Sequence, residues 1–351
     1  MRPLCVILSI TILGLKGLKL ATINDVSKLA NVSSATVSRV INNNLRVAVE
    51  IREKVNEAIK ELNYKPNLSA QTLASNRSNS IGMLLDILAG PYYSALLSSA
   101  EETARNNNFH LIPTSGNQSR ERELDAIDFL KAKQVDGLLI HTGMLTDEDI
   151  LKIVAEMPAT ILLNHYIPEI AENCIGLDDE LGGYLAVKYL LENGHTKIGC
   201  ITGQMDKQAS RNRLQGYRNA LIEYGIPYDD RLIVEGRFDL KDHHLAPRRL
   251  LDRNTQLTAV FCLNDPIAWG LYDVLNERGI SIGDDISVIG FDNNIYGPHL
   301  HPKLTSINFP TSEMGAEAAK KVLSLIKKRA YSIQGKLVPE LVIRNSVKRI
   351  N

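Results

Sequence analysis

The sequence predicts a small all-helical head followed by a larger α/β body made of two lobes with parallel sheets. Residues 21–62 place apolar side chains at helical spacing. From residue 80 onward, short apolar runs alternate with amphipathic helical stretches, which is typical of βαβ units whose parallel sheets are covered on both faces. Because domains hold roughly 150 residues, we expect two similar lobes with a cleft between them.

The charge of the chain is unevenly distributed. The 351 residues carry 40 basic and 40 acidic side chains, but residues 1–80 carry 11 basic and 5 acidic ones. The head therefore has a net charge of +6 and the rest of the chain −6. A basic head on an acidic body indicates a module that binds a polyanion, fused to a regulatory body.

Residues 1–20 have the pattern of a leader. Arg2 and the apolar run Leu4–Leu15 match the first two regions of a signal peptide. This run is too short to span a bilayer, which needs about 20 residues, and no clear small-x-small cleavage site follows it. We expect an over-extended start, with translation beginning near Leu20. A membrane-directing segment is the alternative.

The head is expected to hold three helices and a linker. Thr22 can cap the first helix, Asn31 can form a left-handed turn, and a second helix begins near Ser33 or Ser34. After the polar loop Asn42–Asn44, a third helix is predicted over Glu50–Leu62. A linker over Lys65–Arg77 contains one short helix, Asn67–Ala74.

The body is expected to hold strands at its apolar runs and helices between them, such as Tyr93–Asn107 and Asp265–Arg278. Ligands of parallel sheets bind beyond the carboxyl ends of the strands, so the residues that follow each run are the candidates for a site. The predicted strands are Ile81–Leu85, Phe109–Pro113, Val135–Ile140, Thr160–Leu163, Lys197–Ile201, Ala259–Leu263 and Val288–Phe291.

The first two predicted helices have the features of a DNA-binding helix-turn-helix. Small Ala30 permits close helix packing, and Val32 would fill the core between the helices. The second helix would expose Ser34, Ala35, Ser38 and Arg39, whose side chains suit base edges and phosphates. A three-helix bundle with solvated polar faces is the structural alternative.

The string from Ala30 to Asn42, Ala-x-Val-Ser-x-x-Thr-Val-Ser-Arg-Val-x-Asn, resembles the head of the lactose/galactose-repressor (LacI–GalR) family. Arg52-Glu-Lys-Val55 and Leu62-Asn-Tyr-Lys-Pro-Asn67 extend the resemblance. Asn31 departs from it, because the family more often has glycine there, although the turn geometry still allows asparagine.

The resemblance implies a hinge helix at residues 67–74. Such a helix folds against its dimer partner on DNA, and its leucine, here Leu73, enters the central base step from the minor groove. An isolated helix of this length is marginal, so it would order on contact, and an apolar wedge kinks DNA. Leu73 as an ordinary packing residue is the alternative. The expected DNA-binding residues are Thr22, Ser33, Ser34, Ala35, Thr36, Ser38, Arg39, Asn42, Asn67, Ala70 and Leu73.

The resemblance continues to about residue 345. Matching strings include Pro91-Tyr-Tyr-Ser94, Arg213-Leu-Gln-Gly-Tyr217, Asn264-Asp265 and Val288-Ile-Gly-Phe-Asp292. They are similar to the family's regulatory domain, whose two lobes resemble periplasmic sugar-binding proteins. The implied domains are a non-native or dispensable leader over 1–20, a DNA-binding domain over 21–66, a hinge and linker over 67–79 and a ligand-binding and dimerisation domain over 80–345.

The resemblance and the position of residues after the strands imply six residues that bind a ligand between the lobes, and their chemistry suits a polyhydroxylated sugar. Flat rings cover the apolar face of a sugar or base, and an arginine fork can clamp two adjacent hydroxyls or a carboxylate. The alternatives are an ion pair for Arg213, a helix cap for Asn264, a turn for Asp292 and a core position for Phe238. The candidates are Tyr93, Asn164, Arg213, Phe238, Asn264 and Asp292; Asn164 is a weaker one, as is Asp178, which is not counted among the six.

No enzyme, cofactor or metal site is expected. The motifs G-x-G-x-x-G, G-x-x-x-x-G-K-[ST], H-E-x-x-H and G-x-S-x-G are absent. His243-His244 lies in a polar stretch and is expected to be solvated, and His195 is expected in a helix-to-strand turn. The four cysteines are widely spaced, which favours reduced thiols over disulfides or a zinc knuckle.

The sequence therefore predicts a cytoplasmic, homodimeric transcriptional repressor of a carbohydrate operon, with no membrane partner. Two heads would bind a pseudo-palindromic double-stranded DNA operator, and a small sugar would release them. The overall pattern is most similar to the galactose and β-glucoside regulators of the family. A purine-type corepressor is the alternative effector. An exported sugar-binding protein and a sugar-processing enzyme are the rival classes.

Overall fold

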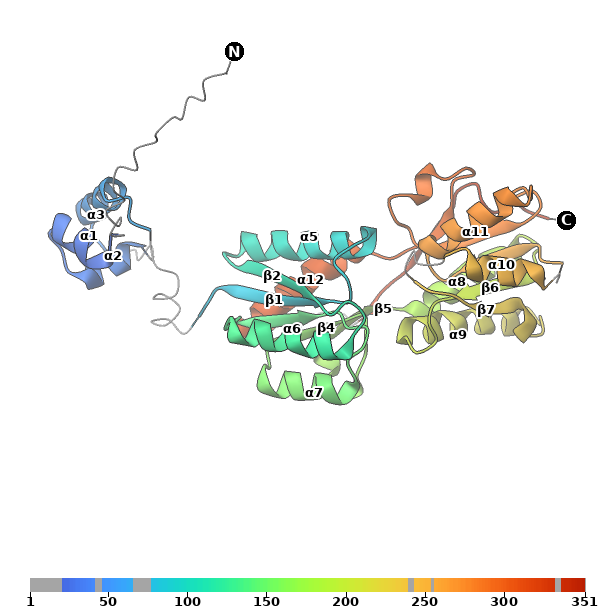
Figure 1. Cartoon of the computed structure of the whole chain (residues 1–351), viewed down its shortest axis with the longest axis horizontal. Coiled ribbons are helices and arrows are strands. Elements are labelled where there is room, and N and C mark those ends of the chain that lie inside the picture. The colour runs from blue at the N-terminus through green and yellow to red at the C-terminus, as the bar shows by residue number, and fades with distance from the viewer. Residues whose placement is uncertain are drawn as a thin grey trace, which may run out of the picture. The chain divides into compact units, whose positions relative to one another are not determined.

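A computed structural model describes residues 21–41, 46–65, 77–238, 243–253, 256–331 and 336–350. The described residues fall into two compact units, one before and one after the Ser78–Asn79 bond (Figure 1). The predicted fold class, a helical head plus a two-lobed α/β body, is confirmed. Across the described part of the chain, no helix is long and apolar enough to cross a membrane.

The head consists of three short helices around one apolar core. They are α1 (Ile23–Leu29), α2 (Ser34–Ile41) and α3 (Val49–Glu61), each within about one residue of its predicted bounds. Asn31 adopts a φ of 50° between α1 and α2, so the predicted left-handed turn is present. The core is formed by Val26, Ala30, Val37, Val40, Val55 and Ala58.

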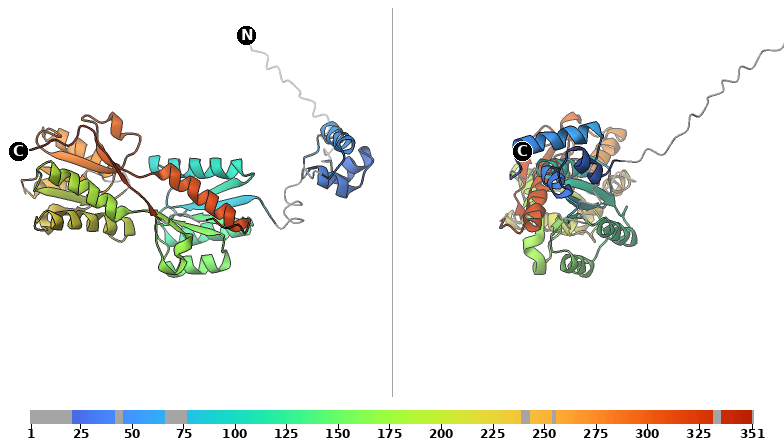
Figure 2. Two further views of the ribbon diagram at one scale, coloured as in Figure 1. Left: turned by 180° about the vertical axis from the view of Figure 1, so that it is seen from behind. Right: turned by 90° about the vertical axis from the view of Figure 1, so that its left-hand side faces the viewer.

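Lobe 1 of the body is a parallel sheet with helices on both faces. Its strand order is β11-β5-β4-β3-β1-β2. Helices α5 (Pro91–Asn106) and α12 (Thr311–Ile326) lie side by side on one face, and α6 (Arg120–Ala132) and α7 (Asp147–Glu156) cover the other (Figures 1 and 2). The strands are β1 (Ser80–Leu85), β2 (His110–Ser115), β3 (Gly137–Ile140), β4 (Thr160–Leu163), β5 (Cys174–Leu177) and β11 (Lys336–Leu337).

Lobe 2 repeats this architecture with the strand order β12-β10-β9-β8-β6-β7. All of its strand pairs are parallel except β10–β12, so the expectation of parallel sheets fails at this edge. The strands are β6 (Ile198–Thr202), β7 (Ile233–Glu235), β8 (Ala259–Cys262), β9 (Ser287–Asp292), β10 (Thr305–Asn308) and β12 (Glu340–Val342). The helices are α8 (Asp179–Glu192), α9 (Gln208–Glu223), α10 (Leu245–Asp252) and α11 (Asp265–Glu277), with short 3-10 turns at Pro168–Asn173, Asp230–Leu232 and Gly297–His299.

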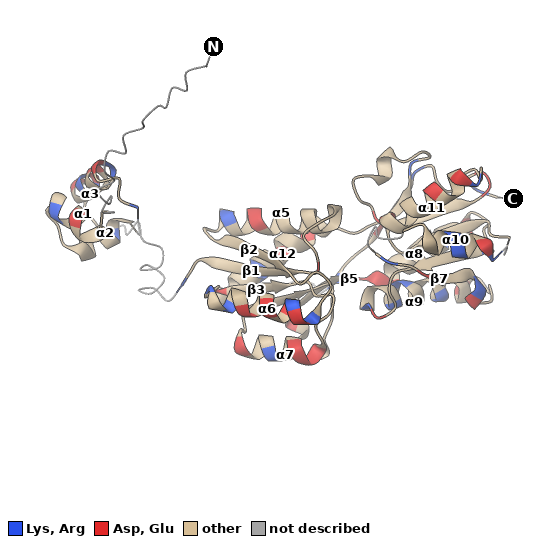
Figure 3. Cartoon of the chain, viewed as in Figure 1, with Lys and Arg blue, Asp and Glu red and all other residues tan. Residues whose placement is uncertain are grey.

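The two lobes are joined because the chain crosses between their sheets. It passes to lobe 2 after β5, returns after β10 to form α12, and passes back after β11 to form β12. The strands are largely buried between helical layers, so Lys, Arg, Asp and Glu lie mainly on the helices (Figure 3). The described cysteines Cys174, Cys200 and Cys262 are buried free thiols.

A close contact between α8 and α9 sets the position of two charged side chains. A Cβ atom at Gly183 of α8 would overlap the carbonyl oxygen of Arg213 on α9. Because glycine has no Cβ, the two helix backbones can approach closely, and α8 carries Asp179 next to Arg213. The fold therefore uses glycine here to place an ion pair at the end of the lobe 2 sheet.

Candidate functional site: an exposed helix and an interlobe cleft

The second helix of the head begins with a side-chain cap. Ser33 Oγ accepts a hydrogen bond from the Thr36 backbone N–H at 3.1 Å, as the predicted N-cap role requires. Ala35 and Arg39 are exposed on α2, as expected. Ser34 is half-buried rather than exposed, because its hydroxyl donates to Asn24 Oδ1 at 2.9 Å. Ser38 is also half-buried.

Of the other residues predicted to contact DNA, Thr22 and Thr36 have partners within the head, and four lie outside the described residues. Thr22 forms a capping box with Asp25 at the start of α1, so its hydroxyl already stabilises the helix end. Thr36 Oγ1 lies 2.9 Å from Ser33 Oγ. Asn42, Asn67, Ala70 and Leu73, with the hinge helix, lie outside the described residues, and their predicted contacts stay predictions.

A cleft of about 790 Å³ lies between the two lobes of the body. It opens beyond the carboxyl ends of the strands, where ligands of parallel sheets bind. Asp86 follows β1 and His141 follows β3 in lobe 1, whereas Asn264 follows β8 and Asp292 ends β9 in lobe 2. The sheet order reverses at β1/β3 and at β6/β8, so both topological switch points face the cleft.

All six predicted ligand residues line this cleft: Tyr93, Asn164, Arg213, Phe238, Asn264 and Asp292. The weaker candidate Asp178 is not among the lining residues. Its carboxylate instead caps α8 by accepting from the Leu181 backbone N–H at 3.2 Å. The structure thus brings together side chains from segments more than 190 residues apart, such as Tyr93 and Asp292.

Arg213 is the buried cation at the floor of the cleft. Its Nε donates to Asp179 Oδ1 at 2.7 Å, its Nη1 donates to the Leu263 carbonyl at 2.5 Å, and Nη1 lies 3.6 Å from Asp292 Oδ1. The side chain is only 4% exposed, which excludes the surface ion pair considered from the sequence. Its guanidinium carbon lies 3.6 Å from the centre of the Phe291 ring, a cation–π contact.

Burial raises the pKa of three acidic groups in lobe 2. Burial raises the pKa of Asp292 to about 8, although the Arg213 charge opposes this shift. The pKa of Asp179 is also raised by burial, again against the effect of Arg213. The pKa of Asp265, at the start of α11, is raised to about 7 by burial, while its hydrogen bonds from Ser306 and Asn294 act to lower it.

Lobe 1 contributes an aromatic wall to the cleft. The Tyr93 ring packs edge-on against Tyr92 and His141, with ring centres 5.1 and 5.3 Å apart. Tyr92 also packs edge-on against Phe309, in a segment that crosses between the lobes. Burial lowers the pKa of His141 to about 4, so this imidazole is neutral at pH 7. Tyr92 Oη and His141 Nδ1 are buried and have no hydrogen-bond partner within the described ranges.

Two of the lobe 2 candidates combine structural roles with their position in the cleft. Asn264 is the N-cap of α11, since its Oδ1 accepts from the Ile267 backbone N–H at 3.0 Å. Its Nδ2 donates to the Phe238 carbonyl at 2.9 Å. The Phe238 ring is half-buried and its centre lies 5.5 Å from the Arg213 guanidinium carbon. The helix-cap alternative for Asn264 is therefore correct, and it coexists with exposure to the cleft.

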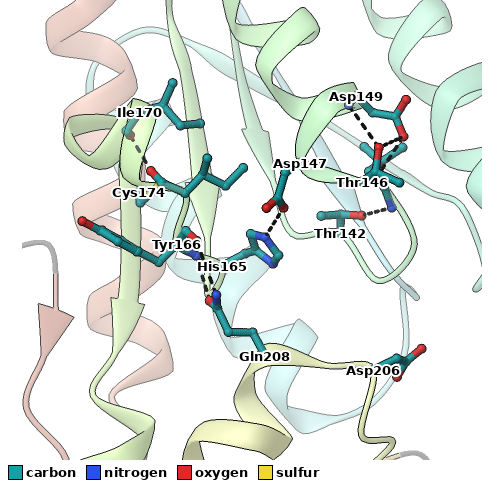
Figure 4. A network of polar contacts seen from close by, with 12 residues as sticks. Thr142, Thr146, Asp147, Asp149, His165, Tyr166, Ile170, Cys174, Asp206 and Gln208 are labelled. Atoms are coloured by element: carbon teal, nitrogen blue, oxygen red, sulfur yellow. Dashed lines mark hydrogen bonds and ion pairs between the residues drawn. The ribbon is translucent and has the colours of Figure 1, made fainter.

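Hydrogen bonds connect the two lobes along the rim of the cleft. The Lys207 ammonium donates to the Gly143 carbonyl. Gln208 at the start of α9 accepts from the Tyr166 N–H at 2.9 Å and donates to the Tyr166 carbonyl at 3.4 Å (Figure 4). His165, beside Tyr166, pairs with Asp147 at 2.8 Å (Figure 4). The contacts of Lys207 and Gln208 thus join lobe 2 to lobe 1, whereas the His165–Asp147 pair lies within lobe 1.

Some cleft residues were not predicted from the sequence. Asp86 and His141 directly follow strands β1 and β3, so the same strand-end rule that selected Asn164 could have found them. Tyr92, Lys207, Gln208 and Trp269 come from helices or loops, and no short-range pattern marks them. Outside the cleft, His243 and His244 are half-buried and lie close to Asp273, whereas solvated histidines were expected.

Comparison with known proteins agrees with this geometry. Residues 22–67 match the family described as "Bacterial regulatory proteins, lacI family", and residues 187–347 match a "Periplasmic binding protein-like domain". A curated relative is the HTH-type transcriptional regulator GalR of Escherichia coli K12, 36% identical over 93% of this chain and 96% of the relative. Another is the HTH-type transcriptional repressor PurR of Vibrio atlanticus, 38% identical over 95% and 100%.

Solved structures are similar over the same extent. One is described as the lac repressor dimer bound to operator and the anti-inducer ONPF, with a TM-score of 0.86, 29% identity and coverage of 94% of this chain and 100% of that one. Another is the transcriptional regulator CelR in complex with cellobiose, with a TM-score of 0.70, 30% identity and coverage of 93% and 99%. These relatives are regulators of transcription, so the prediction that the chain is not an enzyme is confirmed.

Proposed function

Because the chain belongs to the lacI family of bacterial regulatory proteins, we propose that it is a cytoplasmic repressor of a carbohydrate-utilisation operon, released from its operator by a small sugar. The observation that carries this proposal is the cleft, in which the six predicted ligand residues meet on the same chain as the DNA-binding head. In the proposed division, residues 21–66 bind DNA, 67–79 form the hinge and 80–345 bind the ligand.

For DNA binding, we propose that the chain forms a homodimer on a pseudo-palindromic operator. A related repressor is described as a dimer bound to operator, which supports this assembly for the present chain. Exposed Ala35 and Arg39 on α2 would face the major groove, and Leu73 of the hinge would enter the minor groove. Recognition by such small side chains depends in part on DNA shape.

The ligand arm of the proposal favours a neutral, polyhydroxylated molecule. The described lining residues include the acids Asp86, Asp292 and Glu313 but only two cations, Arg213 and Lys207. The Arg213 charge is already offset by the Asp179 carboxylate, to which its Nε donates, so a phosphate group would find little uncompensated positive charge. Hydroxyls, by contrast, suit the buried Tyr92 Oη and His141 Nδ1, and the aromatic wall suits an apolar sugar face. A relative bound to cellobiose is consistent with this class.

In the proposed mechanism, the ligand changes how the lobes are arranged. A sugar that contacts Tyr93 in lobe 1 and Asp292 in lobe 2 would bind one lobe arrangement more tightly than another. The contacts of Lys207 and Gln208 with lobe 1 would then shift, and the hinge helices of the dimer would separate. A coupling of about 1–3 kcal/mol between sites is typical.

A thermal-shift panel on the full chain tests the ligand arm. Neutral sugars, their phosphates and purines would each be titrated into wild-type protein, and we expect one neutral sugar to raise the melting temperature. Arg213→Ala should abolish that shift, whereas Arg211→Ala, on the exposed side of the same helix, should not. Stabilisation by a purine alone would replace the sugar with the corepressor alternative, and stabilisation by none would contradict the ligand arm.

Operator binding by two variants tests the DNA arm. Arg39→Ala should weaken binding by about 1–3 kcal/mol if Arg39 contacts a base, and Leu73→Ala should weaken it by losing the hinge wedge. The controls are Arg122→Ala and Leu88→Ala, which are exposed residues of the body. Full operator affinity in Leu73→Ala would exclude the proposed hinge contact.

A further inference from the structure

Two histidines and an aspartate form a cluster in lobe 2, outside the residues that line the cleft. His243 and His244 directly precede α10, and Asp273 lies on α11. One ring nitrogen of each histidine and one carboxylate oxygen of Asp273 all lie within 4.8 Å of one another. His243 Nε2 lies 3.7 Å from Asp273 Oδ2.

The backbone of α11 explains why the histidines come so close to Asp273. Gly270 lies one turn before Asp273, and a Cβ atom there would overlap the His243 carbonyl oxygen. Residues three apart share one face of a helix. Gly270 therefore lets the segment before α10 approach α11 closely, which brings the ligand atoms of both histidines within 4.8 Å of the Asp273 carboxylate.

One potential metal ligand in the cluster, His244 Nδ1, lacks a hydrogen-bond partner among the described residues. The two imidazole rings face each other with centres 3.8 Å apart and an interplanar angle of 41°. His244 Nδ1 is buried and has no hydrogen-bond partner in the described part of the chain. A buried ring nitrogen without a partner is costly to a protein, and a metal ion would satisfy such an atom.

We propose that His243, His244 and Asp273 bind a divalent transition metal ion. Two imidazole nitrogens and one carboxylate oxygen suit Zn²⁺, Co²⁺, Ni²⁺ or Cu²⁺, whereas Mg²⁺ and Ca²⁺ prefer oxygen ligands alone. In a tetrahedral zinc site, ligand atoms about 2.0–2.2 Å from the ion lie about 3.3–3.6 Å from one another. The three donors lie within 4.8 Å of one another in the structure, so side-chain rotation must bring them closer together to hold an ion.

The position of the cluster determines the effect of the bound ion. The Asp273 side chain is 42% exposed and that of His243 22% exposed, so an ion can enter from solvent and keep a water ligand. The ion would join the start of α10 to the middle of α11, the helix that Asn264 caps at the cleft. Since only the folded chain brings the three donors together, metal binding raises the stability of the folded state.

Zinc titration of the full chain, purified without a histidine tag and freed of metal, tests the proposal. Calorimetry should show one high-affinity Zn²⁺ ion per chain, and Zn²⁺ should raise the melting temperature. Asp273→Asn, His243→Ala and His244→Ala should each lower the association constant by more than about tenfold. Asp252→Asn, His299→Ala and His301→Ala are matched controls elsewhere in lobe 2 and should bind Zn²⁺ like wild type.

Two further measurements keep the outcome decisive. Circular dichroism in the presence of a chelator checks that each variant folds. If a histidine variant does not fold, the isosteric substitution Asp273→Asn at an exposed position tests the metal site instead. Co²⁺ absorption should show a nitrogen- and oxygen-ligated ion in wild type and lose that spectrum in Asp273→Asn. Absence of saturable Zn²⁺ binding in wild type, or equal binding by Asp273→Asn and wild type, would overturn the site.

Discussion

At the scale of residues, Asp292 makes the stability of the body depend on pH. Burial raises its pKa from an ordinary value of 3.8 to about 8, so the folded protein holds this proton where the unfolded chain has released it. Stability therefore falls as pH rises towards 8. Asp265, with a pKa raised to about 7, adds a slope of the same sign.

Urea unfolding between pH 6.5 and 8 measures this effect. His141 has a lowered pKa of about 4, so most of its contribution is complete at its ordinary value of 6.5, and the remaining gain of about 0.4 kcal/mol is the same in wild type and in Asp292→Asn. From pH 6.5 to 8, wild type should lose about 1–2 kcal/mol through Asp292. Asp292→Asn should remove that part of the slope and keep the part due to Asp265. An unchanged slope in Asp292→Asn would contradict the assignment.

Arg213 is the second residue whose replacement gives a defined result. Arg213→Ala leaves the Asp179 carboxylate buried without its main partner, which should destabilise the protein by about 3–5 kcal/mol. Arg211→Ala, on the same helix, removes only exposed contacts and should change stability by less than about 0.5 kcal/mol. Chemical denaturation of both variants measures the difference. Equal losses in the free energy of unfolding would show that the buried Arg213–Asp179 pair does not stabilise the body.

The cleft residues that could be predicted from the sequence either follow a predicted strand or match a position of the family. Asn264 and Asp292 follow apolar runs, and Arg213 was selected by its resemblance to a family position. The pairing of Arg213 with Asp179 could not be predicted, because it depends on the packing of α8 against α9. The inward position of Ser34 likewise depends on Asn24, ten residues earlier in α1.

At the scale of elements, the contact between α8 and α9 gives a steric prediction. Gly183→Ala adds a methyl group that overlaps the Arg213 carbonyl, and neither helix backbone can yield without moving Arg213. We expect a loss of about 1–3 kcal/mol, larger than the gain in helix propensity. Gly176→Ala is the matched control, because the nearest atom to its added methyl is 3.6 Å away. Thermal unfolding compares the two, and equal stability would exclude the close packing.

The elements themselves were predicted unevenly. The head helices and the long apolar strands were found from periodicity alone, with ends displaced by one or two residues. Strand β10 was missed because its buried Thr305 and Ser306 are polar; Thr305 Oγ1 accepts from the Arg344 backbone N–H, and Ser306 Oγ donates to Asp265. Strands β7, β11 and β12 hold only two or three residues, too few for a pattern.

At the scale of the whole molecule, Gln208 joins the two lobes across the cleft. Gln208→Ala removes both hydrogen bonds to the Tyr166 backbone, so the arrangement in which the lobes meet should lose about 1–2 kcal/mol. If the sugar binds that arrangement, its half-saturating concentration should rise roughly 5- to 30-fold. Gln215→Ala, whose amide bonds within the same helix, should leave it unchanged. An unchanged half-saturating sugar concentration for Gln208→Ala would show that the Gln208–Tyr166 contact does not affect ligand binding.

The central claim is that a ligand in the cleft controls the DNA affinity of the head. Fluorescence anisotropy of the full chain on DNA from its own upstream region, at fixed salt and with and without the sugar selected by thermal shift, tests it most directly. The account predicts tight binding that the sugar weakens about 5- to 150-fold, and an Arg213→Ala protein that binds the DNA but no longer responds. Specific binding that no sugar weakens, or a response that survives in Arg213→Ala, would contradict it.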